Sequence, residues 1–371
     1  MITFLTDLLN INPAYNDSII RYQSDQSGMT KSDIVINALP PLSVYSYGGI
    51  FQYNLKDIVK TEINKNGFKD SIIPNISSGN YIYSDPSLQL KINAEISVYG
   101  TITGESITTN YTFIKSAEQL IGYNRKLQSG NNIRLLLPTK NNFDYQVTYF
   151  EGYPFDFAVY GIQSGDTYYF KNSNIGMSSD VYTSEDSEVK RIYLSDGGTN
   201  ITLGDILIMS STLNRIELWV NDQLKSNISI NRIESDCGVY LKWFNQSGSY
   251  SYWRFDQFYN ETFKTKDLDV INGKWDNLQN ISSTSESLGK TCEQTIQLNT
   301  TFNNWDKEYL SDLALSPHVE MYIHQTPFNQ IQEFDFIGVK VSDGSFPFGN
   351  KNSKNKFKIT LEMPSINTVT Y

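Results

Sequence analysis

A run in the first third of the chain strongly limits what that part can fold into. From Leu88 to Val98, apolar side chains occupy every second position, and polar side chains fill the positions between them. A two-residue period is that of a β-strand with one buried face and one wet face, and an α-helix cannot accommodate it. We therefore expect a long strand here. Thr109–Ile114 is its expected hairpin partner, after a turn between Gly100 and Gly104.

The composition extends this expectation to the whole chain. Among 371 residues, 19% are charged and 13% are aromatic, so charge is low and aromatic content is high. Tyr, Ile and Thr favour pleated surfaces, while Asn, Ser and Gly favour turns. Apolar residues still supply 39%, enough to form packed cores. These numbers predict a mostly β protein, built of antiparallel β-sandwich or barrel domains with one or two short helices.

Two segments depart from the strand pattern. Apolar residues recur at helical spacing between Leu55 and Ile63, which predicts one short helix. The segment Asp306–Leu315 predicts a second helix, which ends before Pro317 because the residue preceding a proline disfavours helical backbone.

The length exceeds that of one ordinary core, so we expect two or three domains. Runs of strand-like sequence group into a first β domain at 1–115, a second at 116–232, and a third at 233–371 that contains the helix near 306–315. No repeat of fixed period relates the three.

Within the second and third domains, short strands are expected to be joined by turns and loops. Phe143–Phe150 and Phe155–Tyr160 flank Glu151–Pro154, a link of hairpin length, so we expect these strands to pair. The segment 171–188 is rich in Ser, Asn, Asp and Gly, and 343–356 is rich in Gly and Lys, so both are expected to be long loops. Whether they order only on assembly is left open.

The most aromatic stretch, Gly238–Phe255, reads as a β-hairpin with its turn at Asn245–Gly248. Alternation gives each strand one apolar face that contains a tryptophan, Trp243 or Trp253. We expect this face to be core, and the opposite Tyr, Lys and Arg face to be wetter or to meet a neighbour. The alternative is an exposed aromatic platform for sugars or bases.

The net charge of −10 argues against tight binding to nucleic acid, which requires clustered cations. Only the segment Lys351–Lys358 gathers several lysines. An acidic surface can nevertheless line a conduit through which DNA passes without being bound.

The N-terminal segment lacks a cationic region, and no stretch approaches about 18 apolar residues, so we expect neither a secretory signal nor membrane insertion. Cys237 and Cys292 do not make a disulfide framework. They are expected to be reduced, although one bridge between them remains open.

No residue pattern in the sequence indicates a catalytic or metal-binding site. His318 and His324 lie about 20 Å apart if both are on one straight strand, so a zinc site of Cys237, Cys292, His318 and His324 would need the chain to bend. No nucleophile elbow accompanies a Ser-His-Asp arrangement, and no spacing selects a glycosidase acid pair among 40 acidic residues. We therefore predict no catalytic, cofactor-binding or metal-binding residues, and no enzymatic activity.

A succession of motifs runs through the chain in a fixed order. Its members are Asn12–Tyr15, Gln23–Gly28, Pro40–Pro41, Gly49–Val59, Cys237–Asn245, Tyr250–Phe255, Tyr309–Val319 and Asn355–Glu362. This succession resembles that of tail structural proteins of tailed bacteriophages and prophages of Bacteroidetes-type hosts. The hairpin turn departs from the Gly-Gly pattern of that family, with Ser247-Gly248-Ser249 in its place.

The resemblance implies a non-enzymatic virion protein, assembled in the host cytoplasm. Such a protein forms a symmetric ring with copies of itself at the tube end, hub or adaptor, and contacts other tail proteins. Two alternatives stay open. One is a receptor- or glycan-binding tail fibre or adhesin, and the other is a polysaccharide-degrading tail enzyme.

Overall fold

The computed structural model describes residues 1–37, 39–74, 81–100, 104–118, 133–138, 144–197, 207–234, 237–272, 285–330, 335–349 and 354–370. The chain is mostly β, with multiple antiparallel sheets and two short α-helices, as the composition predicts. It divides into two compact units. Unit 1 comprises Met1–Ser235 and Phe244–Ser251, and unit 2 comprises Asp236–Trp243 and Tyr252–Tyr371. The finer division into three domains stays a prediction.

The N-terminal part of unit 1 has two sheets whose apolar faces belong to one core. The three-stranded sheet has the order β1 (Ile2–Thr6), β3 (Ile19–Ser24), β6 (Ile50–Asn54). The five-stranded sheet has the order β2 (Ile11–Pro13), β9 (Gly104–Ile114), β8 (Gln89–Tyr99), β4 (Lys31–Ile36), β5 (Leu42–Tyr45).

The alternating run is the strand β8, and it pairs with β9 along its whole length, from Gln89↔Ile114 to Tyr99↔Gly104. Ile92, Ala94, Ile96 and Val98 are buried in the shared core, which confirms the two-residue prediction. The first expected helix is α1 (Lys56–Ile63), whose Val59 and Ile63 are buried in the same core.

The remainder of unit 1 is a second sandwich. Its four-stranded sheet has the order β10 (Arg134–Leu135), β12 (Pro154–Tyr160), β16 (Val189–Asp196), β7 (Ile82–Asp85), and the 3₁₀ helix η2 (Pro86–Leu88) follows β7. Its six-stranded sheet has the order β11 (Asp144–Phe150), β18 (Gln223–Ile233), β17 (Leu213–Val220), β13 (Thr167–Asn172), β14 (Met177–Ser178), and β15 (Tyr182–Thr183) also pairs with β13.

The expected hairpin across Glu151–Pro154 is wrong. β11 lies in the six-stranded sheet, where it pairs in parallel with β18, while β12 lies in the four-stranded sheet and pairs with β16. Gly152, at φ 83°, lies in the left-handed conformation within the connection that carries the chain from one sheet to the other. A period of two identifies a strand but does not identify its partner, because both strands of such an arch bury one face in the same core.

The expectation of a long loop at 171–188 also needs correction. This segment contains the end of β13 and the short strands β14 and β15, which both pair with β13. Asn221 and Asp222 both have positive φ and form the turn that joins β17 to β18. Of the other expected loop, 343–349 has no strand, residues 350–353 lie outside the described part of the chain, and Asn355 already begins a strand.

Unit 2 contains one seven-stranded sheet and a two-stranded tip. The sheet has the order β20 (Tyr250–Phe255), β19 (Val239–Phe244), β25 (Val319–Tyr322), β26 (Phe336–Val341), β27 (Asn355–Glu362), β24 (Lys290–Phe302), β21 (Asn260–Asp267). The tip pairs β22 (Val270–Asn272) with β23 (Ser285–Ser287).

The second expected helix is observed as a compound element. The 3₁₀ helix η5 (Asn304–Asp306) leads into α2 (Lys307–Ser311) and then into the 3₁₀ helix η6 (Asp312–Leu315). Its residues Tyr309, Leu310 and Leu313 are buried. Within the described residues, no helix has the length and hydrophobicity needed to cross a membrane.

Candidate functional site

The aromatic hairpin of β19 and β20 is packed inside the protein. Trp243 is 0% exposed and Trp253 is 3% exposed, and the indole nitrogen of Trp253 donates a hydrogen bond to Thr300 Oγ1 at 3.0 Å. Trp243 contacts Tyr309 at a centroid distance of 5.6 Å. The expected core role of the tryptophan face is confirmed, and these two rings offer no open stacking surface.

The opposite face of the hairpin meets neighbouring side chains, which is one of the two outcomes expected for it. Tyr240 and Tyr252 are buried and stack with centroids 6.0 Å apart, and Lys242 is 6% exposed with its ammonium 3.5 Å from Glu320. Alternation separates the two faces of a strand, but it does not show whether one or both of them are covered. The turn is as expected: Gly248 has φ 96°, and an added Cβ would lie 3.0 Å from Ile114 and 3.1 Å from Lys115.

The two histidines do not converge on a shared site. His318 Nε2 lies 3.1 Å from Glu320 Oε1, and His324 Nδ1 lies 3.4 Å from Asp335 Oδ1. They flank β25, one before it and one after it. Cys237 and Cys292 are free thiols. Within the described ranges, no three His, Cys, Asp or Glu side chains come together in a way that could hold a metal ion.

A buried cluster of charges in unit 1 was not expected from the sequence. The guanidinium of Arg191 is fully buried and binds Asp156 with two hydrogen bonds of 2.8 Å, and it donates a third, of 2.6 Å, to Asp70. Asp85 lies 3.6 Å away, and the ring of Tyr250 lies 4.5 Å from the guanidinium carbon. Burial opposes the charge of Arg191, but the charge and hydrogen bonds of its acidic neighbours raise its pKa well above the usual value.

Lys115 is a second buried cation in the same unit. Its ammonium donates to the Gly67 carbonyl and lies 4.6 Å from the ring centroid of Phe68 and 5.7 Å from that of Phe244. Burial lowers the pKa of Lys115 to about 8, against an opposing effect of Asp85. Neither Arg191 nor Lys115 lines the void inside the second sandwich, the polar groove beside it or the groove in unit 2, so we interpret both residues as structural.

One polar groove of about 360 Å³ opens beside the second sandwich of unit 1. It is lined by tyrosines and by polar and charged side chains: Tyr81, Ile82, Ser84, Tyr168, Tyr182, Thr183, Ser184, Glu185, Asp186 and Lys190. Burial opposes ionisation of Asp186, but hydrogen bonds from Lys190, Ser84 and the Glu188 amide lower its pKa to about 2. A carboxyl group with this pKa is ionised at neutral pH and cannot donate a proton as a general acid.

A second groove, of about 640 Å³, lies in unit 2 between the end of η6 and the start of the loop after β26. His318, Lys340 and Asp343 are among its polar lining residues, with Val319, Val339 and Phe346 among its apolar ones.

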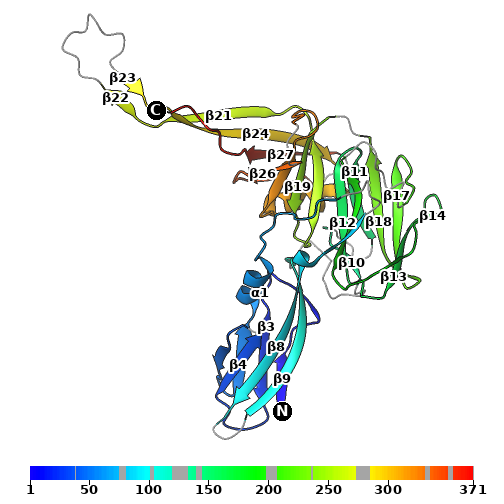
Figure 1. Ribbon diagram of the computed structural model, residues 1–371, viewed down its shortest axis with the longest axis vertical. Helices are drawn as coiled ribbons and strands as arrows, with labels where there is room; N and C mark the ends of the chain where they lie inside the picture. The colour runs from blue at the N-terminus through cyan, green and yellow to red at the C-terminus, as the bar shows by residue number, and fades with distance from the viewer. Residues whose placement is uncertain are drawn as a thin grey trace, which may run out of the picture. The chain divides into compact units, whose positions relative to one another are not determined.

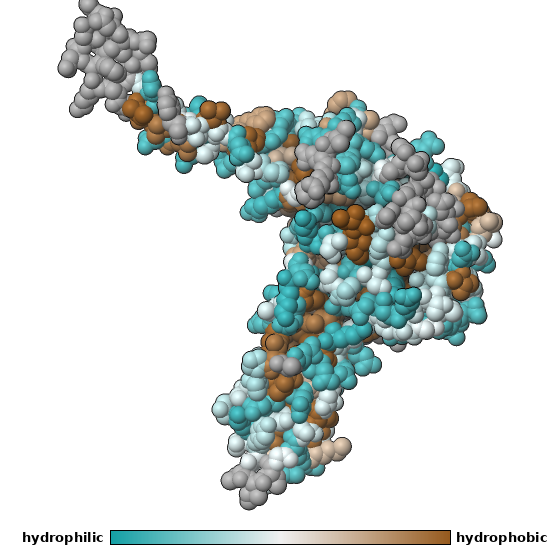
Figure 2. Space-filling view, viewed as in Figure 1, coloured by the Kyte–Doolittle hydropathy of each residue, from teal (hydrophilic) through white to brown (hydrophobic). Residues whose placement is uncertain are grey.

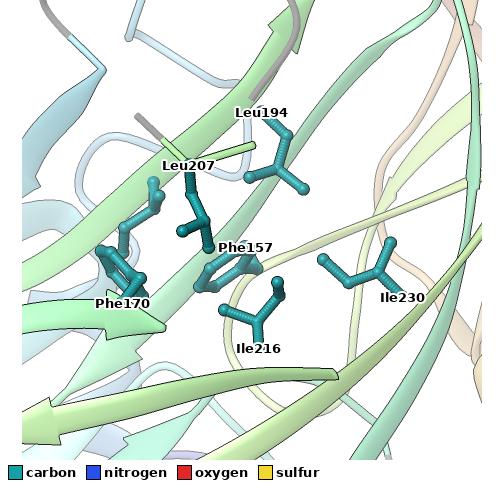
Figure 3. Close-up of a pocket in the computed structure, with 7 residues that line it drawn as sticks. Phe157, Phe170, Leu194, Leu207, Ile216 and Ile230 are labelled. Carbon is teal, nitrogen blue, oxygen red and sulfur yellow. The ribbon is translucent and has the colours of Figure 1, made fainter. Parts of the chain in front are cut away.

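A minute void lies inside the second sandwich. Figure 3 shows side chains from both sheets that converge on it, with Phe157 and Leu194 from one sheet and Phe170, Ile216 and Ile230 from the other. Its volume of about 10 Å³ is close to that of a single water molecule, and its lining is wholly apolar. It is a packing defect between two sheets and not a ligand site.

The most exposed element of regular structure in unit 2 is a two-stranded ribbon. All eight residues of β21 are exposed, and β21 pairs only with β24, from Asn260↔Gln297 to Asp267↔Lys290. The ribbon extends away from the other strands of its own sheet and ends in β22 and β23 (Figure 1). We call residues 260–272 and 285–295, which include β21, β22, β23 and the adjoining part of β24, the arm.

The arm exposes apolar side chains. Phe263 is 55% exposed, Leu268 is 51%, Val270 is 43% and Ile271 is 52%. In Figure 2 the arm carries brown, hydrophobic patches among teal, hydrophilic ones. An exposed ribbon with four large apolar residues is typical of an interaction surface, and it is the candidate site that the structure adds.

Comparisons with known proteins do not assign this chain to a family. No protein-family model matches the sequence, and no curated protein sequence matches it. The fibronectin(III)-like modules of CbhA from Clostridium thermocellum are 8% identical, covering 63% of this chain and 95% of theirs, with a TM-score of 0.18. Drosophila N-cadherin EC1-3 is 11% identical, covering 74% of this chain and 85% of its own, with a TM-score of 0.15. At such TM-scores neither likeness carries an argument about this chain.

Proposed function

We propose that this chain is a non-enzymatic structural protein of a bacteriophage tail, which assembles with copies of itself into a closed ring at the tube end, hub or adaptor. The ordered motifs from Asn12 to Glu362 support this proposal through their resemblance to tail proteins. The net charge of −10 supports it as well, because an acidic ring repels DNA and lets it pass. Other tail proteins are the further partners, and the virion is the site of action.

The proposal rests on a contrast between two sets of large apolar side chains: those of the aromatic hairpin are buried, and those of the arm are exposed. The large rings of the hairpin, Trp243 and Trp253, are used in the core, while the arm leaves Phe263 and Ile271 in water. A protein that works by assembly requires such a surface, whereas an enzyme requires a convergent reactive site.

The polar groove beside Ser84, Tyr168 and Asp186 favours one alternative, a glycan-binding adhesin. Tyrosine rings together with charged and hydroxyl groups are suited to sugars, which present apolar faces and many hydroxyls. The tail enzyme has less support, because Asp186 is held ionised by its partners and a glycosidase needs one protonated carboxyl group.

Two measurements test the proposal. Negative-stain microscopy and sedimentation of the purified chain should show closed rings of six- or twelve-fold symmetry. Antibodies against the chain should label the tails of phage particles induced from its host. A monomer at high concentration and unlabelled tails would contradict the proposal. Trimers that bind a host glycan array through the groove, and that lose binding in Asp186→Asn, would support the adhesin instead.

A further inference from the structure

We propose that the arm is a subunit contact, and that its occupant is the seven-stranded sheet of a second copy of this chain. This inference deepens the proposed function, since it rests on self-assembly and names the surface through which copies join.

The arm has one edge, that of β21, with which no strand of the described part of the chain pairs. β27 pairs with β24 only from Phe302 back to Thr295, so the arm beyond that point is a ribbon of two paired strands. The C-terminal segment runs along the far edge of β24, where the Met363 amide donates to the Gln294 carbonyl and Thr370 bridges Gly289. The outer edge of β21 ends the sheet.

Such a ribbon is expected to gain most of its stability on association. An isolated two-stranded ribbon is marginally stable in water, and an unpaired edge presents backbone donors and acceptors to another chain. The register places Phe263, opposite Gln294, on the face that continues from Ile296, which is a buried core residue. The arm therefore extends a core face into solvent without covering it.

The arm has enough residues for a stable protein–protein contact. The described residues Phe258–Asn272 and Ser285–Thr295 contribute 15 and 11 residues to the arm and its base. A standard protein–protein interface uses about 20–30 residues on each side, so the arm alone is large enough for one stable contact.

The arm and the outer side of β27 carry charges of opposite sign. Five acidic residues and three lysines are on the arm: Glu261, Asp267, Asp269, Glu286, Glu293, Lys264, Lys266 and Lys290. The same unit exposes a row of lysines, Lys354, Lys356 and Lys358, on the outer side of β27, whose alternate residues Phe357 and Ile359 are buried. Within the arm, Lys264 pairs with Glu293 and Lys290 with Asp267. Five acidic residues against three lysines leave the arm with a net charge of −2, and this charge complements the lysine row of the next copy.

This pairing is head-to-tail, because each copy offers an arm and a lysine row at different places on its surface. A heterologous contact of this kind leads to a ring when the rotation closes, whereas an arm-to-arm contact would stop at a dimer. Each copy therefore carries both surfaces of the contact, and the partner that we propose for the arm is a second copy of this chain.

The direct test is photo-crosslinking in the full-length protein. A benzoylphenylalanine at position 263 is irradiated in an assembly mixed from ¹⁴N-labelled and ¹⁵N-labelled chains. We expect mixed-isotope crosslinks to peptides that contain Lys356 and Lys358. The matched control places the same group at Tyr47, which is 93% exposed in unit 1, and should give few such crosslinks.

A charge-reversal series provides the second measurement. Lys356→Glu with Lys358→Glu should raise the dissociation constant of the assembly at least tenfold at 50 mM salt, and less at 500 mM salt. Adding Asp269→Lys and Glu286→Lys should recover most of the affinity. The far-UV circular dichroism of each variant establishes that it folds.

The outcomes separate this inference from the proposed function. Crosslinks confined to single chains, unchanged dissociation constants, or a wild-type chain that stays monomeric would each overturn the arm contact. Rings that persist in the Lys356 and Lys358 variants would refute the arm contact but would remain consistent with a tail protein. Rings that depend on the arm, together with phage tails that the antibodies do not label, would refute the role in the tail but would remain consistent with the arm contact.

Discussion

Trp243 packs edge-on against Tyr309, with ring centroids 5.6 Å apart and ring planes at 68°. The hydroxyl of the same Tyr309 accepts a hydrogen bond of 2.7 Å from the backbone amide of Tyr252, on the neighbouring strand. One side chain from α2 thus covers the buried indole and also satisfies a backbone amide of β20. This contact anchors the helical segment to the hairpin within unit 2.

We expect Tyr309→Phe to destabilise unit 2 by about 1–3 kcal/mol, because the ring contact remains while the buried Tyr252 amide loses its acceptor. Urea unfolding followed by tryptophan fluorescence measures the change. The control Tyr47→Phe alters a fully exposed ring and should shift the free energy by less than about 0.5 kcal/mol. Equal effects of the two substitutions would refute this role of the hydroxyl.

Local pattern predicted the elements of this fold better than their partners. The alternation in β8 and the helical spacing in α1 identified both elements, because each buries one face in a single core. The pairing of β11 and β12 was predicted wrongly, because a short connection can arch between two sheets as well as turn within one. For the Tyr and Lys face of the hairpin the pattern left two outcomes open, a wetter face or a face that meets a neighbour, and the structure shows the second, because Tyr240, Lys242 and Tyr252 are buried.

The candidate site was harder to predict than the fold. The sequence of β21, NETFKTKD, has four charged residues among eight, which is typical of an exposed strand, but it does not show that this strand pairs with β24 at the edge of the sheet. The cluster around Arg191 draws Asp70, Asp85 and Asp156 from distant positions, so its members have no common spacing. Both features arise from long-range topology, which alternation and composition do not encode.

The buried pair Arg191 and Asp156 gives a second stability prediction. Asp156→Asn keeps the shape of the side chain but removes the charge that balances a fully buried guanidinium, and we expect a loss of about 3–5 kcal/mol. Urea unfolding measures it. The matched control is Glu151→Gln, in a more exposed pair with Arg232, which should cost at most about 1 kcal/mol. A loss at Asp156 no larger than at Glu151 would contradict a structural role for the cluster.

Lys115 predicts how stability depends on pH. Its pKa is about 8 in the folded protein and near 10.5 in the unfolded chain. Between these values the unfolded chain holds a proton that the folded protein has released, so the free energy of unfolding rises with pH in this window. Tyr22 and Tyr168 act oppositely above pH 10, because burial raises the pKa of each to about 12.

We therefore expect stability to increase from pH 8 to pH 10 in urea titrations and to fall above pH 10. Lys115→Met should abolish the increase, while Lys65→Met, at an exposed lysine, should preserve it. A rise that survives in Lys115→Met would assign the effect to another group.

The thiols provide the last prediction. A disulfide requires two cysteines whose Cβ atoms face each other at about 3.5–4.5 Å, and Cys237 and Cys292 are both free in this structure. Cys292 lies on β24 opposite Thr265, within the arm, while the Cys237 carbonyl accepts a hydrogen bond of 2.9 Å from Arg254. Protein purified without reductant and then denatured should show two reactive thiols per chain with Ellman's reagent, and Cys292→Ser should show one. Because no bond is lost, Cys292→Ser should also keep the wild-type free energy of unfolding within about 0.5 kcal/mol. Fewer than two thiols in the wild type, with recovery on reduction, would establish a bridge and would contradict the arrangement of these strands.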